Sequence, residues 1–186
     1  MSRYNIDSPE KYSQLYKESV NEPEVFWSEL ASNNFLWEAK WSKVLDWDFR
    51  KAKVSWFKDA KLNITINCID RHVKIHPDKT AIIFEPNNPN EEYKSYSYSE
   101  LLTEVCKMAN VLKSLGVKKG DRVCIYLPMI PELAFSVLAC ARIGAIHSVV
   151  FAGFSSNALA TRIDDCMSSI IITSDGSFRG DKIINL

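Results

Sequence analysis

The feature that most constrains the fold is a regular alternation of strand-like and helix-like segments after residue 79. Runs rich in β-branched and aromatic residues predict strands over 80–84, 93–97, 122–127, 146–151 and 170–173. Apolar residues at helical spacing predict helices from Ser99 to just before Gly116, from Pro131 to Gly144, and over 157–167. We expect 93–97 to form a hairpin with 80–84, and the four strands other than 93–97 to be of parallel type. Right-handed crossovers then produce an α/β fold with a mainly parallel, doubly wound sheet.

The last segment of the chain is predicted to be a helix that begins near Arg179. Ile183, Ile184 and Leu186 are apolar, and no capping residue follows them. Because a folded domain normally completes its last helix, we expect a truncated sheet, cut after its fourth strand of parallel type.

The first part of the chain differs from the rest in composition. All five tryptophans lie within residues 1–56, whereas the six glycines lie from Gly116 onward. This break near residue 75 predicts two regions, 1–75 and 76–186. We expect the first region to be a helical, tryptophan-rich arm packed on the sheet. One helix is capped by Ser8, a second begins at Pro23, and 37–57 shows no clear period.

Composition and charge argue against several classes of function. Lys and Arg together number 23, as do Asp and Glu, so that no net charge favours nucleic acid or an anionic membrane. Prolines and glycines interrupt the most apolar stretch, 127–154, which is atypical of a membrane span. The N-terminus has no apolar signal segment, and the five cysteines form no CxxC pair. We therefore expect a cytoplasmic protein with reduced thiols and no metal, nucleic-acid or membrane site.

Common catalytic and nucleotide-binding motifs are absent from the sequence. It contains no GxGxxG, HExxH or GxSxG pattern. Residues 173–182 superficially suggest a phosphate-binding loop, but the two glycines are four residues apart and no Ser or Thr follows the lysine. We therefore do not expect residues 173–182 to form an ATP loop.

Two neighbouring features nevertheless suggest a site for a phosphorylated nucleotide. Arg179 and Lys182 share one face of the first turn of the predicted helix, whose free N–H groups and dipole favour an anion. Phe151 and Gly153 follow the strand 146–151 and offer a flat ring and room for a close approach. Both features lie at the carboxyl ends of parallel strands, where α/β folds bind ligands. On these residues alone, a solvated helix start and a core phenylalanine remain the alternatives.

Several motifs occur in the order found in one enzyme family. They are WF (56–57), LN (62–63), NCIDRH (67–72), KGDRV (119–123), YLPMIPE (126–132), LACARIGA (138–145), HSVVFAGFS (147–155) and DGSFRGDK (175–182). In these motifs the chain resembles the acetyl-coenzyme A synthetases, which are AMP-forming, adenylate-forming ligases. The resemblance runs from about residue 7 to the last residue and covers only the first part of the family's chain.

The resemblance implies a partial site for coenzyme A, with no residue of the chain in a catalytic or metal-binding role. In the family, a turn after one strand and a basic pair hold the 3′-phospho-ADP end of coenzyme A. The corresponding residues here are Phe151, Ala152, Gly153, Arg179 and Lys182. The family usually has Gly in place of Ala152, and often in place of Asp181. These two departures are expected to weaken coenzyme A binding without moving the site.

The resemblance also implies what the chain does not carry. The family's ATP loop, acetate pocket and catalytic lysine correspond to positions after Leu186, so that ATP and Mg²⁺ belong to the full-length family enzyme. We expect the chain alone to be inactive, with the missing C-terminal part of the ligase as its partner. Two alternatives remain: a non-catalytic interaction or weak nucleotide-binding module, and a fragment of another short-chain acyl or acetoacetyl-CoA ligase.

Overall fold

The computed structural model describes residues 4–180 and 182–186, apart from the side chain of Arg179. The chain divides into two compact units, Met1–Leu62 and Asn63–Leu186, which we call unit 1 and unit 2. Within the described part of the chain, no helix combines the length and apolar character needed to cross a membrane.

Unit 1 begins with the two predicted helices, α1 (Pro9–Asn21) and α2 (Pro23–Asn34). Ser8 caps α1 as expected, because its side-chain oxygen accepts a hydrogen bond from the backbone N–H of Lys11 at 3.1 Å. Both helices have a proline in their first turn, where the absent N–H costs no helical hydrogen bond.

The second half of unit 1 is a β-hairpin, where the sequence showed no clear period. Strands β1 (Lys43–Asp48) and β2 (Lys53–Lys58) pair antiparallel around a short 3-10 helix, η1 (Phe49–Lys51). The short runs KVLDWD and KVSWFK are rich in residues that favour strands. Aromatic residues on both faces, however, obscured the alternation of apolar and polar residues that is typical of a strand. Many of these rings contact one another within unit 1, as in the edge-to-face pairs Trp27–Trp56 and Trp41–Phe57.

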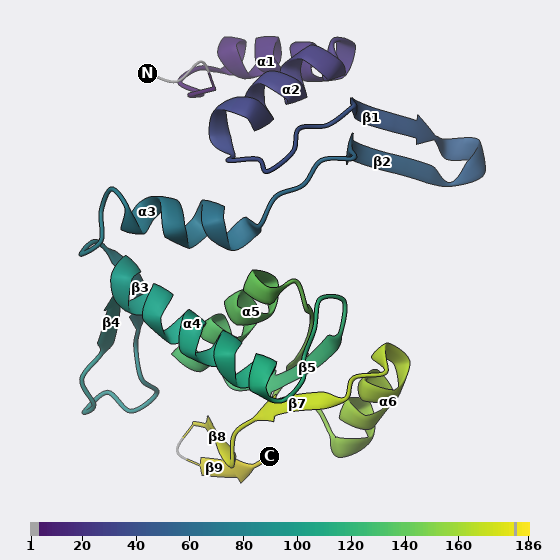
Figure 1. The fold of residues 1–186 in the computed structure, drawn as a ribbon. Coiled ribbons are helices and arrows are strands. Elements are labelled where there is room, and N and C mark those ends of the chain that lie inside the picture. Colours follow the sequence, from purple (N-terminus) through teal and green to yellow (C-terminus); the bar gives the residue numbers. More distant parts are fainter. Residues whose placement is uncertain (1–3, 181) are drawn as a thin grey trace. The chain divides into compact units, whose positions relative to one another are not determined.

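The centre of unit 2 is a three-stranded parallel sheet with the order β6-β5-β7. Its strands are β5 (Arg122–Leu127), β6 (Ile146–Phe151) and β7 (Ile170–Thr173), connected by α5 (Pro131–Ile143) and α6 (Ser156–Cys166) (Figure 1). Helix α5 ends as expected at Gly144, which has a φ of 75°. The α/β fold predicted from the sequence is therefore confirmed.

Alternate side chains of β5 are buried against two different sets of helices, because successive residues of a strand point to opposite faces. Val123, Ile125 and Leu127 lie in a core with residues of α4 (Tyr98–Ser114) and α5. Cys124 and Tyr126 lie in a second core, against which residues of α6 pack. Strand β5 is thus covered on both faces, which explains its nearly continuous apolar sequence.

The segments before β5 differ from the prediction in two ways. Strand β3 (Thr80–Phe84) pairs with β4 (Lys94–Ser97) in the expected hairpin. This hairpin forms a separate antiparallel sheet, so that the parallel sheet of the described residues has three strands and not four. Helix α4 is capped by Ser97 and not by Ser99. Ser97 is the better cap because Glu100 stands three residues later and completes a reciprocal capping box.

The predicted final helix is wrong, because the chain forms a hairpin there. Strands β8 (Gly176–Arg179) and β9 (Lys182–Asn185) pair antiparallel, with Arg179 and Lys182 as Cα partners. Gly180 follows β8 with a φ of 58°, a conformation that glycine adopts without strain. A Gly-Asp pair between two short runs that contain Phe and Ile indicates a hairpin. This signal outweighed the helical spacing of the apolar residues on which the helix was predicted. Asp181 itself lies outside the described residues.

Candidate functional site

A cavity of about 700 Å³ opens at the carboxyl end of the parallel sheet. Its wall is formed by the segments that follow β3, β5, β6 and β7, together with both strands of the β8–β9 hairpin. Loops at the carboxyl ends of parallel strands form the usual ligand site of open α/β sheets. The topology therefore places this cavity where this fold class binds its ligands.

The turn after β6 contributes three of the five predicted site residues to the cavity wall: Phe151, Ala152 and Gly153. The turn is closed by a hydrogen bond from the N–H of Phe154 to the carbonyl of Phe151 at 3.0 Å. The Phe151 side chain is 61% exposed, whereas Ala152 is buried. Phe151 and Phe154 meet edge to face with their ring centroids 5.9 Å apart. The turn therefore presents aromatic surface to the cavity.

The other two predicted residues, Arg179 and Lys182, are the last Cα pair of the β8–β9 hairpin and lie next to its turn. Among the described residues of this hairpin, Gly176, Phe178 and Ile184 line the cavity and Lys182 does not, whereas the side chain of Arg179 lies outside the described part of the chain. The hairpin rules out the expected helix start, so its free N–H groups and dipole are not available to an anion. The carbonyl of Gly180 accepts a hydrogen bond from the Asn87 side-chain amide at 2.9 Å, which ties the hairpin to the β3–β4 loop.

The cavity has more acidic than basic character. Glu85, Glu91 and Asp175 line it, and its described lining contains no lysine, arginine, histidine or cysteine. Four phenylalanines also lie on the wall: Phe84, Phe151, Phe154 and Phe178. Carboxylates repel phosphate groups but accept hydrogen bonds from amines, and the rings suit a flat apolar group. Such a wall is suited to a ligand that carries a flat ring and an amine.

Tyr126 belongs to this site, although sequence reasoning did not identify it. Its side chain is 6% exposed, and its hydroxyl lies 2.8 Å from the carbonyl of Phe154 and 3.1 Å from that of Ala152. The sequence offered one signal for this role: a tyrosine in a strand whose residues after Arg122 are otherwise apolar. A tyrosine buried in such a strand needs a hydrogen-bond partner for its hydroxyl.

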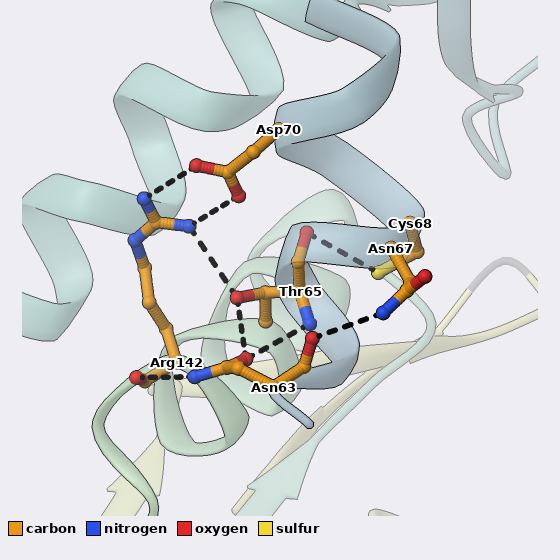
Figure 2. A network of polar contacts seen from close by, with 6 residues as sticks. All are labelled: Asn63, Thr65, Asn67, Cys68, Asp70 and Arg142. Atoms are coloured by element: carbon orange, nitrogen blue, oxygen red, sulfur yellow. Dashed lines mark hydrogen bonds and ion pairs between the residues drawn. The ribbon is translucent and has the colours of Figure 1, made fainter. Parts of the chain in front are cut away.

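A second polar cluster lies away from the cavity and ties α5 to the segment 63–70 (Figure 2). This segment contains a π-helical turn, η2 (Ile66–Asp70), which is followed by α3 (Arg71–Val73). The Arg142 guanidinium donates to both Asp70 oxygens at 2.8 and 2.9 Å, and these bonds hold the pKa of the Asp70 carboxyl below its usual range. The Asn63 amide donates to the Arg142 carbonyl at 3.0 Å. This cluster gives the NCIDRH motif a structural role, because Asp70 of the motif joins its segment to α5 through Arg142. We call this contact the joint between Asp70 and Arg142.

No group of three or more His, Cys, Asp or Glu residues in the described part of the chain is arranged to hold a metal ion. In the same part, each of the five cysteines is a free thiol.

Comparison with known proteins identifies the family. Residues 69–185 match the family described as AMP-binding enzyme, and residues 12–68 match the acetyl-coenzyme A synthetase N-terminus. The chain belongs to the AMP-binding enzyme family. It is 52% identical over 177 residues to an acetyl-coenzyme A synthetase of Magnetococcus marinus, a match that covers 95% of this chain. It is 54% identical over 180 residues to that of Leptospira biflexa, covering 96% of this chain.

The resemblance predicted from the motifs is thereby confirmed. In both relatives the match covers 27% of the relative's own length. The chain is therefore similar to the N-terminal portion of acetyl-coenzyme A synthetases.

Proposed function

We propose that this chain serves as the N-terminal portion of an AMP-forming acetate–CoA ligase and carries part of its site for coenzyme A. The overall reaction would convert acetate, ATP and coenzyme A into acetyl-CoA, AMP and pyrophosphate. The identity of about half of the residues to acetyl-coenzyme A synthetases supports this assignment. The single observation that carries the site is the cavity at the carboxyl end of the sheet, with Phe151, Ala152 and Gly153 on its wall.

The character of the wall suggests how coenzyme A would bind. A flat adenine ring suits the exposed face of Phe151, and an exocyclic amine suits the carboxylates of Glu85, Glu91 and Asp175. These carboxylates disfavour phosphates inside the cavity. The 3′-phosphate would therefore lie outside it, near Arg179 and Lys182 at the end of the hairpin.

We further propose that the chain binds coenzyme A without catalysing ligation on its own. The aromatic rings and carboxylates of the wall support a role in ligand binding, and the resemblance assigns the groups that stabilise the transition state to the part of the family enzyme outside the match. ATP, Mg²⁺ and acetate would be held by the part of the family enzyme outside the match, on the same or a separate polypeptide. That part would be the functional partner of this chain, in the cytoplasm, where five free thiols stay reduced.

The proposal is tested by NMR titration of the chain with coenzyme A and with dephospho-coenzyme A. We expect a dissociation constant near or above about 1 mM, because much of the full site lies elsewhere. Shifts should concentrate at Phe151 and Gly153 and be larger with coenzyme A. Arg179→Ala should remove the difference between the ligands, whereas Lys107→Ala, which removes an exposed cation of α4, should retain it. Equal shifts from both ligands, or shifts elsewhere, would contradict the proposal.

A further inference from the structure

The hydroxyl of Tyr126 contacts the backbone of the turn after β6 from the buried side. It lies between two carbonyls of this turn, at 2.8 Å from that of Phe154 and 3.1 Å from that of Ala152. A tyrosine hydroxyl has one proton, so the two carbonyls share a single donor. The ring packs in the core between β5 and α6, which prevents the hydroxyl from moving away.

This contact acts on the shape of the turn. The bond from Phe154 to Phe151 closes the turn, and it leaves the carbonyls of Ala152 and Phe154 to find other donors. Because Ala152 is buried, water is a poor substitute for the tyrosine hydroxyl there. Removal of the hydroxyl would leave a buried carbonyl without its donor and release the turn.

A second contact supports the turn from its exposed side. The Arg162 guanidinium carbon lies 4.5 Å from the centroid of the Phe154 ring, within the range of a cation–π interaction. The same guanidinium donates to the carbonyl of Ala158 at 2.8 Å, which keeps it near α6. Phe154 in turn contacts the ring of Phe151. Tyr126 from within and Arg162 from outside therefore hold the two rings of the turn.

We propose that Tyr126 is a positioning residue for the coenzyme A site, because it holds the turn that places Phe151 on the cavity wall. This inference rests on the proposed function. Tyr126 acts on the aromatic part of the site and not on the basic end of the hairpin. Its loss should therefore weaken every ligand that uses Phe151, with or without a 3′-phosphate.

Tyr126→Phe tests the proposal, since it removes only the hydroxyl. We expect NMR titrations to show coenzyme A and dephospho-coenzyme A weakened by the same factor, about threefold to tenfold, with the ratio of their affinities retained. The amide of Phe154 should exchange with solvent faster. Tyr96→Phe is the matched control: Tyr96 is half-buried beside Phe135 and is not on the cavity wall, so both affinities should stay unchanged.

The outcomes separate this inference from the proposed function. If the wild-type chain fails to prefer coenzyme A, the proposed function is wrong and the role of Tyr126 in that site is wrong with it. If the wild type shows the preference but Tyr126→Phe binds each ligand with the affinity of the wild type, only the inference is overturned. A loss confined to coenzyme A would also overturn it, because Tyr126 would then act on the phosphate.

An exposed variant keeps the inference testable if Tyr126→Phe does not fold. Arg162→Met removes the outer support of Phe154 without changing the core. It should weaken both ligands by the same factor of about two to three. Unchanged affinities for both would contradict the idea that the shape of this turn controls binding.

Discussion

The joint between Asp70 and Arg142 allows a quantitative test of what stabilises unit 2. Arg142→Met keeps most of the apolar stem of the side chain and removes its charged end. It thereby deletes both hydrogen bonds to the Asp70 carboxylate and a longer one, of 3.4 Å, to the hydroxyl of Thr65. Asp70 is left partly buried without the donor that compensates its charge.

The magnitude follows from the exposure of the pair. The side chains of Arg142 and Asp70 are 26% and 25% exposed, which is intermediate between a surface pair and a buried one. Surface pairs contribute about 0.2–1 kcal/mol, and breaking a buried pair costs about 3–5 kcal/mol. We therefore expect Arg142→Met to lower the free energy of unfolding of unit 2 by about 2 kcal/mol. For a unit of this size, the midpoint of thermal unfolding should fall by roughly 6–10 °C.

Urea unfolding followed by the NMR amide signals of β5 measures this loss, because Val123 and Ile125 are fully buried in unit 2. Tryptophan fluorescence is unsuitable, since all five tryptophans lie in unit 1. The matched control is Lys107→Met, which removes an ion pair with Glu104 whose side chains are 66% and 36% exposed. It should cost less than about 0.5 kcal/mol. Equal losses in the two variants would refute the argument.

The same pair predicts a pH dependence. Hydrogen bonds from Arg142 lower the pKa of the Asp70 carboxyl in the folded chain. A lowered carboxyl pKa stabilises the fold above the unfolded value of about 3.9, and this stabilisation is lost as the pH falls through the folded value. The difference in stability between the wild type and Arg142→Met should therefore be constant near neutral pH and shrink below about pH 4. A difference that persists in acid would mean that Arg142 acts mainly through packing.

Two further predictions concern a helix cap and a thiol. Ser97→Ala should destabilise unit 2 by about 1 kcal/mol in urea unfolding, because it removes the cap of α4. Ser99→Ala should cost less than half of that. The reverse order would show that Ser99 caps the helix, as expected from the sequence. Burial raises the pKa of the Cys140 thiol to about 11, so that about one molecule in a thousand carries its thiolate at pH 8. Mass spectrometry after brief treatment with iodoacetamide should find Cys140 unmodified while the partly exposed Cys166 is labelled, and equal labelling would show that Cys140 is not buried.

Patterns that repeat along the chain predicted most of the fold. The apolar run 122–127 and the helical spacing before Gly144 each report a local element, and both elements occur where the sequence indicated. The prediction failed where two local signals competed. At 179–186 the apolar residues matched a helical spacing, while Gly180 and the strand-forming residues around it favoured a hairpin. At α4, two serines could act as the cap, and Glu100 decided between them.

The aromatic residues of the candidate site could be predicted from the sequence, but the long-range hydrogen bonds that support them could not. Phe151 and Gly153 are adjacent to the end of a strand, so their place on the wall follows from the topology. The contacts of Tyr126 with Ala152 and of Asn87 with Gly180 join residues 26 and 93 positions apart. No local pattern reports such pairs, because they depend on how the loops at the end of the sheet meet.

The change from helix to hairpin alters how a phosphate would be bound at Arg179 and Lys182. A helix start supplies free N–H groups and a dipole that contribute to anion binding independently of side-chain charge. A hairpin supplies neither, so that binding there depends on the charges of the two side chains, and salt screens such attraction over a Debye length of about 10 Å at 0.1 M ionic strength. The aromatic turn held by Tyr126 is apolar in character and is much less sensitive to salt. The two parts of the proposed site should therefore respond differently to salt. The affinity from the turn should change little with salt, whereas the preference for the phosphorylated ligand, which the hairpin supplies, should fall as the salt concentration rises.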